Sequence, residues 1–365
     1  MSNRNTTRQV HEYSMMGRVS NWVKAMRLQT ALVTSLSLWA GYITVSGINL
    51  DSALFLGTLG VLFHIFGFTM NEVEDYKYDA GIGNGSSHPI AQGKINLGQA
   101  KLLYMLALVS CITMSFTVSV LYGYNIYGTL ALCASVLPGV MYNKYSKEEW
   151  WSNIYLSAWV AMMVLAGSMY AGMPNYVTAL ISIALAIQAF IQVVEGDLKD
   201  LSGKESSFCK RLGVDMISPY EYVNRNTIVT MDDDKLATFQ DAVISYTKRF
   251  VAIVYGLKFT ELLILMYIPF RYAGTSPYDM RLYSVIFFIN IIVFITSMSA
   301  LLVYVYDRDK IKKASSVHEL SGITLVGLSL MPFSVRGGIM IAVLPIIWYI
   351  AVNKLLYQNS LNPDI

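Results

Sequence analysis

Two short acidic motifs carry the spacing that binding of a divalent metal requires. In the first, Asn71, Asp75 and Asp79 recur at every fourth residue, so a helix would present all three on one face. Along that face they span about 12 Å. Carboxylates in one row repel each other unless a cation lies between them, and their oxygens are ligands that suit Mg²⁺. The spacing therefore predicts a magnesium-binding helix face.

The second motif, E-G-D-L-K-D-L-S-G at residues 195–203, places Asp197 and Asp200 three residues apart, which makes them neighbours on a helix. Asp197 lies 122 residues after Asp75, and Asp200 lies 121 residues after Asp79, as in a weak internal repeat. Repeats in membrane proteins often place a shared site between two halves. Facing motifs with two or more Mg²⁺ ions would grip a diphosphate and neutralise the charge that develops as it leaves.

A plainer interpretation is open for either motif alone. Charged residues at a helix end are often a solvated cap at the membrane surface, where an acid costs less than at the bilayer centre. Two motifs in the same relative place, both beside basic loops, favour a shared site over two unrelated caps.

Apolar segments long enough to cross a membrane surround both motifs. The 365 residues are 55% hydrophobic and 14% charged, against about 25% charged in soluble chains, and the mean hydropathy is +0.46. Segments of about 20 apolar residues span a bilayer as helices. The stretch 321–335 is ambiguous between an interfacial segment, a re-entrant segment and a tenth crossing. The nine predicted spans are 28–47, 53–70, 102–122, 125–142, 153–171, 175–194, 250–270, 283–305 and 337–357.

Positive charge indicates the orientation of these spans. The segments on one side carry 22 Lys and Arg residues, whereas the opposite side, counted through the loop 271–282, carries only Arg271 and Arg281. Because basic residues concentrate on the cytoplasmic side, the N-terminus and both motifs are predicted to be cytoplasmic. The net charge of +3 is modest and argues against a nucleic-acid partner.

The chain is predicted to form one transmembrane domain, residues 28–357, with a cytoplasmic loop at about 195–249. It follows an N-terminal cytoplasmic segment, residues 1–27, whose basic and apolar residues indicate an interfacial helix, and precedes a tail at 358–365. In the long loop, the acidic run 232–234 is best interpreted as a helix start with Asp234 as the N-cap.

The ordered set of motifs resembles the UbiA superfamily of intramembrane prenyltransferases. The shared pattern is N-x-x-x-D-x-x-x-D, then P-I-x-x-G-[KR], then D-x-x-D-x-x-G ahead of an L-G pair. Here these are Asn71/Asp75/Asp79, residues 89–94, Asp197/Asp200/Gly203 and Leu212-Gly213. The resemblance covers roughly residues 20–357. It implies an all-α bundle of about nine transmembrane helices around a central cavity, with Mg²⁺ as cofactor and an isoprenoid diphosphate as donor.

The resemblance also implies roles for single residues. Asp75, Asp79, Asp197 and Asp200 would be catalytic and, with Asn71, would bind the metal or the diphosphate. The implied anion contacts are Lys94, Lys144 and Lys210, and Tyr142 would line the pocket. For Lys94 alone, an ordinary positively charged loop residue is the simpler interpretation.

Polar residues within the spans add candidates. His64 lies seven residues before Asn71, deeper on the same face, where it would touch the acceptor, act as a base, or simply bond to a neighbouring helix. Gln188 and Gln192 form an i, i+4 pair that would line the cavity. Elsewhere, Lys258 and Glu261 are predicted to form an internal ion pair.

Two positions depart from the family pattern. Glu72 stands where the residue after the first Asn is usually Asp, and Lys204 stands where the second motif usually ends in an acid, unless Glu195 or Glu205 replaces that acid. The stretch 214–247 is also longer than is typical. These departures affect the assignment of individual metal ligands and of the subfamily more than the assignment of the class.

The sequence thus predicts Mg²⁺-dependent transfer of a polyprenyl group from its diphosphate to an acceptor in a lipid bilayer. Two alternatives stay open: a membrane terpene cyclase of the same superfamily, and a cation-coupled secondary transporter. Transporters usually place acids near the bilayer midplane at broken helices, whereas these acids follow unbroken spans. Acceptor, prenyl length, source membrane and oligomeric state are not encoded in the motifs.

Overall fold

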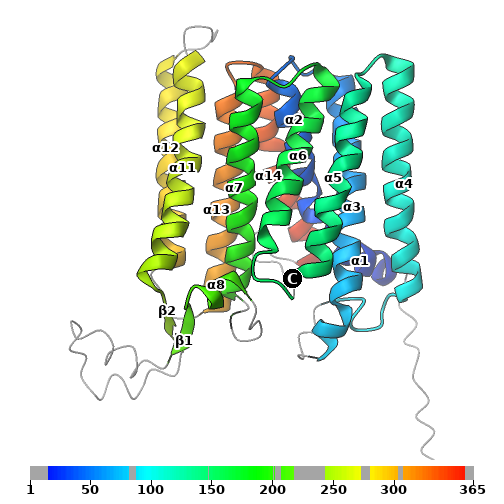
Figure 1. Cartoon of the computed structure of the whole chain (residues 1–365), viewed down its shortest axis with the longest axis vertical. Coiled ribbons are helices and arrows are strands. Elements are labelled where there is room, and N and C mark those ends of the chain that lie inside the picture. The colour runs from blue at the N-terminus through cyan, green and yellow to red at the C-terminus, as the bar shows by residue number, and fades with distance from the viewer. Residues whose placement is uncertain are drawn as a thin grey trace, which may run out of the picture.

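The computed structural model describes residues 15–81, 88–146, 148–199, 201, 207–217, 243–272, 280–302 and 307–357. Within them, ten helices of 13 to 32 residues form one bundle (Figure 1). They are α2 (Ala31–Ile43), α3 (Leu50–Gly81), α4 (Leu97–Tyr122), α5 (Ile126–Tyr145), α6 (Asn153–Ala171), α7 (Tyr176–Lys199), α11 (Lys248–Tyr272), α12 (Met280–Leu302), α13 (Arg308–Leu330) and α14 (Val335–Tyr357).

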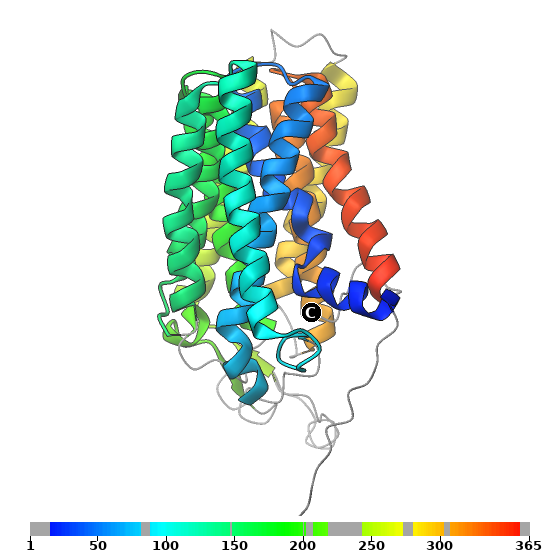
Figure 2. The same cartoon turned by 90° about the vertical axis from the view of Figure 1, so that its right-hand side faces the viewer.

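Short elements gather at one end of this bundle. They are α1 (Met15–Ala25), the 3-10 helix η1 (Leu28–Thr30), α8 (Phe208–Arg211), and the antiparallel strands β1 (Asp215–Ile217) and β2 (Val243–Ser245). Helix α1 lies across the bundle end (Figure 2). The acidic run 232–234 and the tail 358–365 lie outside the described residues.

Eight of the long helices are long and apolar enough to cross a membrane, namely all except α2 and α13. Helix α2 has only 13 residues. The fold is therefore an all-α membrane bundle, and the predicted count of about nine spans is close to the observed number.

Residues 321–330 of the ambiguous stretch 321–335 belong to a longer helix than the sequence indicated, and residues 331–334 form the turn before α14. Helix α13 begins at Arg308, ends at Leu330 and packs between α12 and α14 while also contacting α7 and α11. Its first half is basic and polar, which hides it from a hydropathy criterion. Because α13 runs the length of the bundle (Figure 1), α14 ends beside α1, where Lys24 lies 4.9 Å from the ring centroid of Tyr357.

The first half of the bundle is organised around a close crossing of α2 and α6. A Cβ added to Gly41 would lie 1.9 Å from the carbonyl oxygen of Val164, and one added to Gly167 would lie 2.1 Å from that of Leu38. Small residues let helix backbones approach this closely in membranes. Around the crossing, α2 also contacts α3 and α14, so α3, which carries the first motif, packs against this crossing.

Both acidic motifs continue long helices without a break. Helix α3 carries the first motif through its last turns to Gly81, and α7 carries the second as far as Lys199. The C-terminal ends of α3 and α7 lie at the same end of the bundle, together with α8, β1 and β2 (Figures 1 and 2). The prediction that the two motifs share one face of the molecule is thus confirmed for these helix ends.

Candidate functional site

The first motif presents a buried carboxylate at the end of α3. The side chain of Asp75 is 7% exposed, and Asn71, one turn earlier, is half-buried. The side chain of Asp79 lies outside the described residues. A carboxylate this far withdrawn from water is not a solvated cap, and Asp75 interacts electrostatically with the Arg27 guanidinium.

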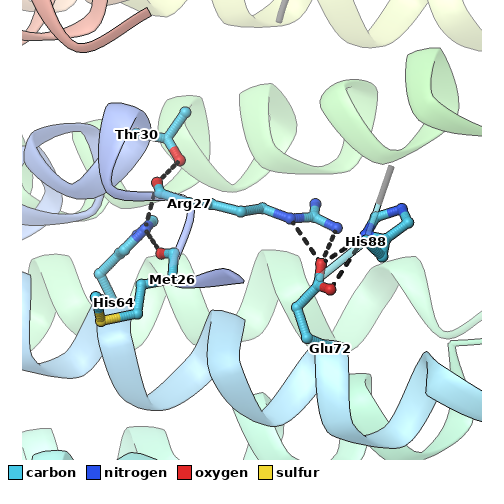
Figure 3. Close-up of polar contacts among 6 residues, drawn as sticks. All are labelled: Met26, Arg27, Thr30, His64, Glu72 and His88. Atoms are coloured by element: carbon cyan, nitrogen blue, oxygen red, sulfur yellow. Dashed lines mark hydrogen bonds and ion pairs between the residues drawn. The ribbon is translucent and has the colours of Figure 1, made fainter. Parts of the chain in front are cut away.

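Glu72, the departure in this motif, is held by two cationic or donor side chains (Figure 3). Arg27 donates to Oε1 of Glu72 from Nε at 3.3 Å and from Nη2 at 2.9 Å. Nδ1 of His88 lies 3.0 Å from Oε1 and 3.1 Å from Oε2. Since a carboxylate only accepts, Nδ1 of His88 is the donor. Glu72 itself is 3% exposed, so its carboxylate is fully engaged with protein groups.

Arg27 is a permanent cation at the first motif. It connects α1 to η1. Its φ of 47° lies in the left-handed region, and among the described residues it is the one non-glycine residue with a positive φ. Burial alone would lower the pKa of its guanidinium, but the Glu72 carboxylate, with a contribution from Asp75, raises the pKa above its ordinary value. Tyr142 is close enough to interact with it electrostatically. Sequence reasoning did not single out Arg27 as a site residue.

His64 is bonded to a neighbouring segment, one of the alternatives raised above. Nε2 lies 3.1 Å from the carbonyl oxygen of Met26 and 3.0 Å from that of Arg27 (Figure 3). Nδ1 lies 2.8 Å from Oγ1 of Thr34. Carbonyl oxygens only accept, so Nε2 carries the hydrogen and Nδ1 accepts from the Thr34 hydroxyl. Both ring nitrogens are therefore engaged within the protein, and neither is available to bind an acceptor substrate. The contribution of His64 is to hold the backbone at Arg27.

The segment 88–96 returns the chain to the first motif. Backbone bonds from Gln92 to His88 and from Lys94 to Pro89 fold it tightly. Ile90 and Ile95 are buried in a small apolar cluster, whose buried members also include Ala25, Val73 and Ala100. Lys94 is exposed on this docked segment, which places its charge at the same end of the bundle.

The second motif has a comparable arrangement. Asp197 is 2% exposed, and Asp200 lies outside the described residues. Glu195, two residues before Asp197, accepts from Oγ of Ser315 at 2.5 Å, and its Oε1 lies 2.5 Å from Nδ1 of His318 in a contact that lacks the geometry of a hydrogen bond. Both partners come from α13, so the helix that hydropathy missed supports the second motif.

A polar seam extends from this motif into the bundle. Gln192 is half-buried and bonded to Glu319. Lys258 donates to Oε1 of Gln188 at 2.6 Å and to Oε2 of Glu261 at 2.8 Å. The predicted internal ion pair of Lys258 and Glu261 is therefore confirmed.

The remaining basic candidates and Tyr142 belong to α5 and α8. Tyr142 is half-buried and Lys144 is exposed, both in the last turn of α5. Lys210, in α8, pairs with Asp215 at 2.6 Å. An anion at Lys210 would have to compete with that carboxylate.

The donors present suit Mg²⁺, which prefers carboxylate and amide oxygens and keeps several waters or phosphate oxygens. Asp75 and Asp197 supply buried carboxylates, and Asn71 supplies an amide. Among the described side chains, no three His, Cys, Asp or Glu residues converge into a ready-made metal cluster. An ion shared with a diphosphate would fit this donor set better than an all-protein cage.

Sequence-family and structural comparisons agree with this arrangement. The model of the UbiA prenyltransferase family matches residues 31–207. No curated protein sequence matches the chain.

The apo structure of a UbiA homologue from Aeropyrum pernix matches with a TM-score of 0.57 at 13% identity, covering 82% of this chain and 98% of that one. A UbiA homologue from Archaeoglobus fulgidus gives 0.53 at 14%, covering 88% and 99%. The same homologue bound to GPP and Mg²⁺ gives 0.50 at 14%, covering 84% and 99%. At such identities the likeness concerns the fold. Residues 31–207 therefore match the UbiA prenyltransferase family, and the bundle as a whole has the fold of UbiA homologues.

Proposed function

We propose that this protein transfers a prenyl group from an isoprenoid diphosphate to an acceptor, with Mg²⁺ as cofactor, and releases diphosphate. The observation that carries the proposal is that α3 and α7 bring one acidic motif each to the same end of the bundle (Figure 1), with Asp75 and Asp197 buried there. The Archaeoglobus homologue bound to GPP and Mg²⁺ supports this donor class and this metal. The excess of basic residues on this side supports a cytoplasmic orientation of the site.

Five side chains would hold the metal and the diphosphate: Asn71, Asp75, Asp79, Asp197 and Asp200. Mg²⁺, when bound, neutralises the negative charge that develops on the departing diphosphate. Burial strengthens the attraction between these carboxylates and a cation, because the local dielectric constant is lower than that of water. A prenyl carbon that loses the diphosphate becomes an allylic cation, which the acceptor then attacks.

The basic side chains at the same end would bind the diphosphate oxygens. Lys94 and Lys144 are exposed there, and Lys210 would exchange Asp215 for the anion. Tyr142, beside Arg27, would line the pocket, and Gln192 would lie on its α7 wall. His64 acts indirectly, through the backbone at Arg27.

The test is diphosphate release and product formation by purified protein in liposomes, supplied with prenyl diphosphates of several chain lengths and a native membrane extract as acceptor source. The double variant replaces one carboxylate in each motif, Asp75→Asn and Asp197→Asn. It should lower diphosphate release by about 100-fold or more, which at about 1.4 kcal/mol for each factor of ten is a loss of about 2.8 kcal/mol of transition-state stabilisation. Thr129→Val is the matched control. It removes a buried hydroxyl that bonds Ser115 at 2.8 Å, near the opposite end of the bundle.

Mass spectrometry of the products separates the outcomes. A prenylated acceptor supports the proposal, whereas a cyclised hydrocarbon formed without acceptor would make the protein a terpene cyclase. Unchanged diphosphate release by the double variant, or solute flux that does not need Mg²⁺, would refute the proposed reaction.

A further inference from the structure

We infer that each acidic motif is oriented by a buried glutamate held by a histidine, and that these glutamates are positioning residues and not metal ligands. The first latch is Glu72 with His88 and Arg27, and the second latch is Glu195 with His318 and Ser315. The inference rests on the proposed function, because it assigns parts within the same metal and diphosphate site.

The first latch ties three segments together just before Asp75. His88 reaches Glu72 from the segment that follows the motif, and Arg27 reaches it from the segment that precedes α2 (Figure 3). All the contacts fall on a carboxylate that is 3% exposed. Glu72 and Asp75 are three residues apart and so about 60° apart around the helix, which means that the latch restrains the helix face that carries Asp75.

The second latch joins α7 to α13. Ser315 and His318, one turn apart on α13, both contact the carboxylate of Glu195. His318 is completely buried, and its ring lies against Phe294 of α12, with centroids 4.9 Å apart. Asp197 follows Glu195 by two residues, about 200° around the helix. Because Glu195 is held toward α13, Asp197 must point away from α13.

Neither glutamate is free to bind a metal. Both oxygens of Glu72 accept hydrogen bonds from Arg27 and His88. In Glu195, Oε2 accepts from Ser315, and Oε1 is in close contact with Nδ1 of His318 without the geometry of a hydrogen bond. Withdrawing Glu72 toward a metal would leave the donors of Arg27 and His88 without their acceptor, and withdrawing Glu195 would do the same to the hydroxyl of Ser315. The same construction in both halves therefore leaves ligation to the aspartates and fixes the rotation of α3 and α7.

The contacts at Nδ1 suggest a sharp pair of substitutions at each histidine. Asparagine places an amide nitrogen where the histidine has Nδ1, so His88→Asn preserves the donor to Glu72 and His318→Asn keeps a polar group in contact with Glu195. His88→Ala and His318→Ala remove these groups. A role that depends only on the latch should be lost in the alanine variants and largely restored in the asparagine variants.

The experiment titrates Mn²⁺, as a paramagnetic substitute for Mg²⁺, into purified full-length protein with inorganic diphosphate present, and measures bound metal by electron paramagnetic resonance. Each alanine variant should weaken Mn²⁺ binding by about tenfold or more, the usual effect of removing a residue that supports a metal ligand. Each asparagine variant should stay within about threefold of the unaltered protein. Amide hydrogen exchange over 88–96 should accelerate in His88→Ala and not in His88→Asn. Thr129→Val controls for the general loss of a buried polar contact.

Three results would overturn the latches. The first is that the alanine variants bind Mn²⁺ as tightly as the unaltered protein. The second is that the asparagine variants bind Mn²⁺ as weakly as the alanine variants while thermal melting shows intact folding, and the third is that Thr129→Val lowers the Mn²⁺ affinity equally. Failure of the proposed function looks different. The unaltered protein would then bind Mn²⁺ with diphosphate, and respond to the substitutions, yet release no diphosphate from a prenyl donor.

Discussion

The buried ion pair between Lys258 and Glu261 provides a quantitative test of the packing in the second half of the bundle. The Lys258 ammonium lies 2.8 Å from Oε2 of Glu261, and the two side chains are 4% and 1% exposed. It also donates to Gln188 and lies 4.6 Å from the ring centroid of Phe294. The perturbations are Lys258→Met, which keeps the length of the side chain, Glu261→Gln, and the double variant.

The expected magnitude follows from what each change leaves behind. Lys258→Met leaves a buried carboxylate without its partner, which costs about 3–5 kcal/mol of unfolding free energy. Glu261→Gln leaves the ammonium with Gln188 and the aromatic ring, so its cost should fall at the lower end of that range. The double variant buries no net charge from this pair, so it should lose less than the sum of the single changes, with a coupling energy of about 2 kcal/mol or more.

The assay is thermal unfolding of the purified variants in one detergent at one protein concentration. A loss of about 3 kcal/mol corresponds to a melting temperature lower by roughly 4 °C, because the unfolding entropy of a chain of 365 residues is about 0.8 kcal/mol/K. The matched control is the surface i, i+3 pair of Lys310 and Asp307, at 3.2 Å with side chains 79% and 36% exposed. Lys310→Met should change the stability by less than about 1 kcal/mol. Single variants at 258 and 261 that melt like this control, or effects that simply add, would refute the reasoning.

Further predictions concern the helix crossing, the histidine beneath the first motif and the metal. Gly167→Ala would place a Cβ 2.1 Å from the carbonyl oxygen of Leu38 and should destabilise the fold by about 1–3 kcal/mol or more, seen as a lower melting temperature; an unchanged melting temperature would contradict the tight crossing of α2 and α6. His64→Ala removes the donor to the carbonyls of Met26 and Arg27 and should cost about 1–3 kcal/mol; a variant with unaltered stability and no prenyl transfer would instead assign His64 to the chemistry. Chelation of divalent ions should abolish diphosphate release and added Mg²⁺ should restore it, whereas full turnover in chelator would exclude the metal site.

Much of the fold is local in origin and was predictable. The lengths of the apolar segments predicted the long helices because lipid leaves a spanning backbone no alternative to internal hydrogen bonds. The i, i+4 spacing of Asn71, Asp75 and Asp79 placed them on one helix face because α3 continues through the motif. Lys258 and Glu261 were predictable as a pair for the same reason, being one turn apart.

Two features depended on tertiary structure. Helix α13 was hidden because its first half is polar, and only its packing against α7 gives Ser315 and His318 a buried partner in Glu195. The role of Glu72 could not be predicted from the sequence either, because its partner Arg27 is 45 residues before it and its partner His88 is 16 residues after it. Helical periodicity sets which residues lie on one face, but it does not determine which distant side chains meet that face. The acidic motifs were therefore determined by the sequence itself, and the contacts that orient them were decided only when α1, α13 and the segment 88–96 packed against α3 and α7.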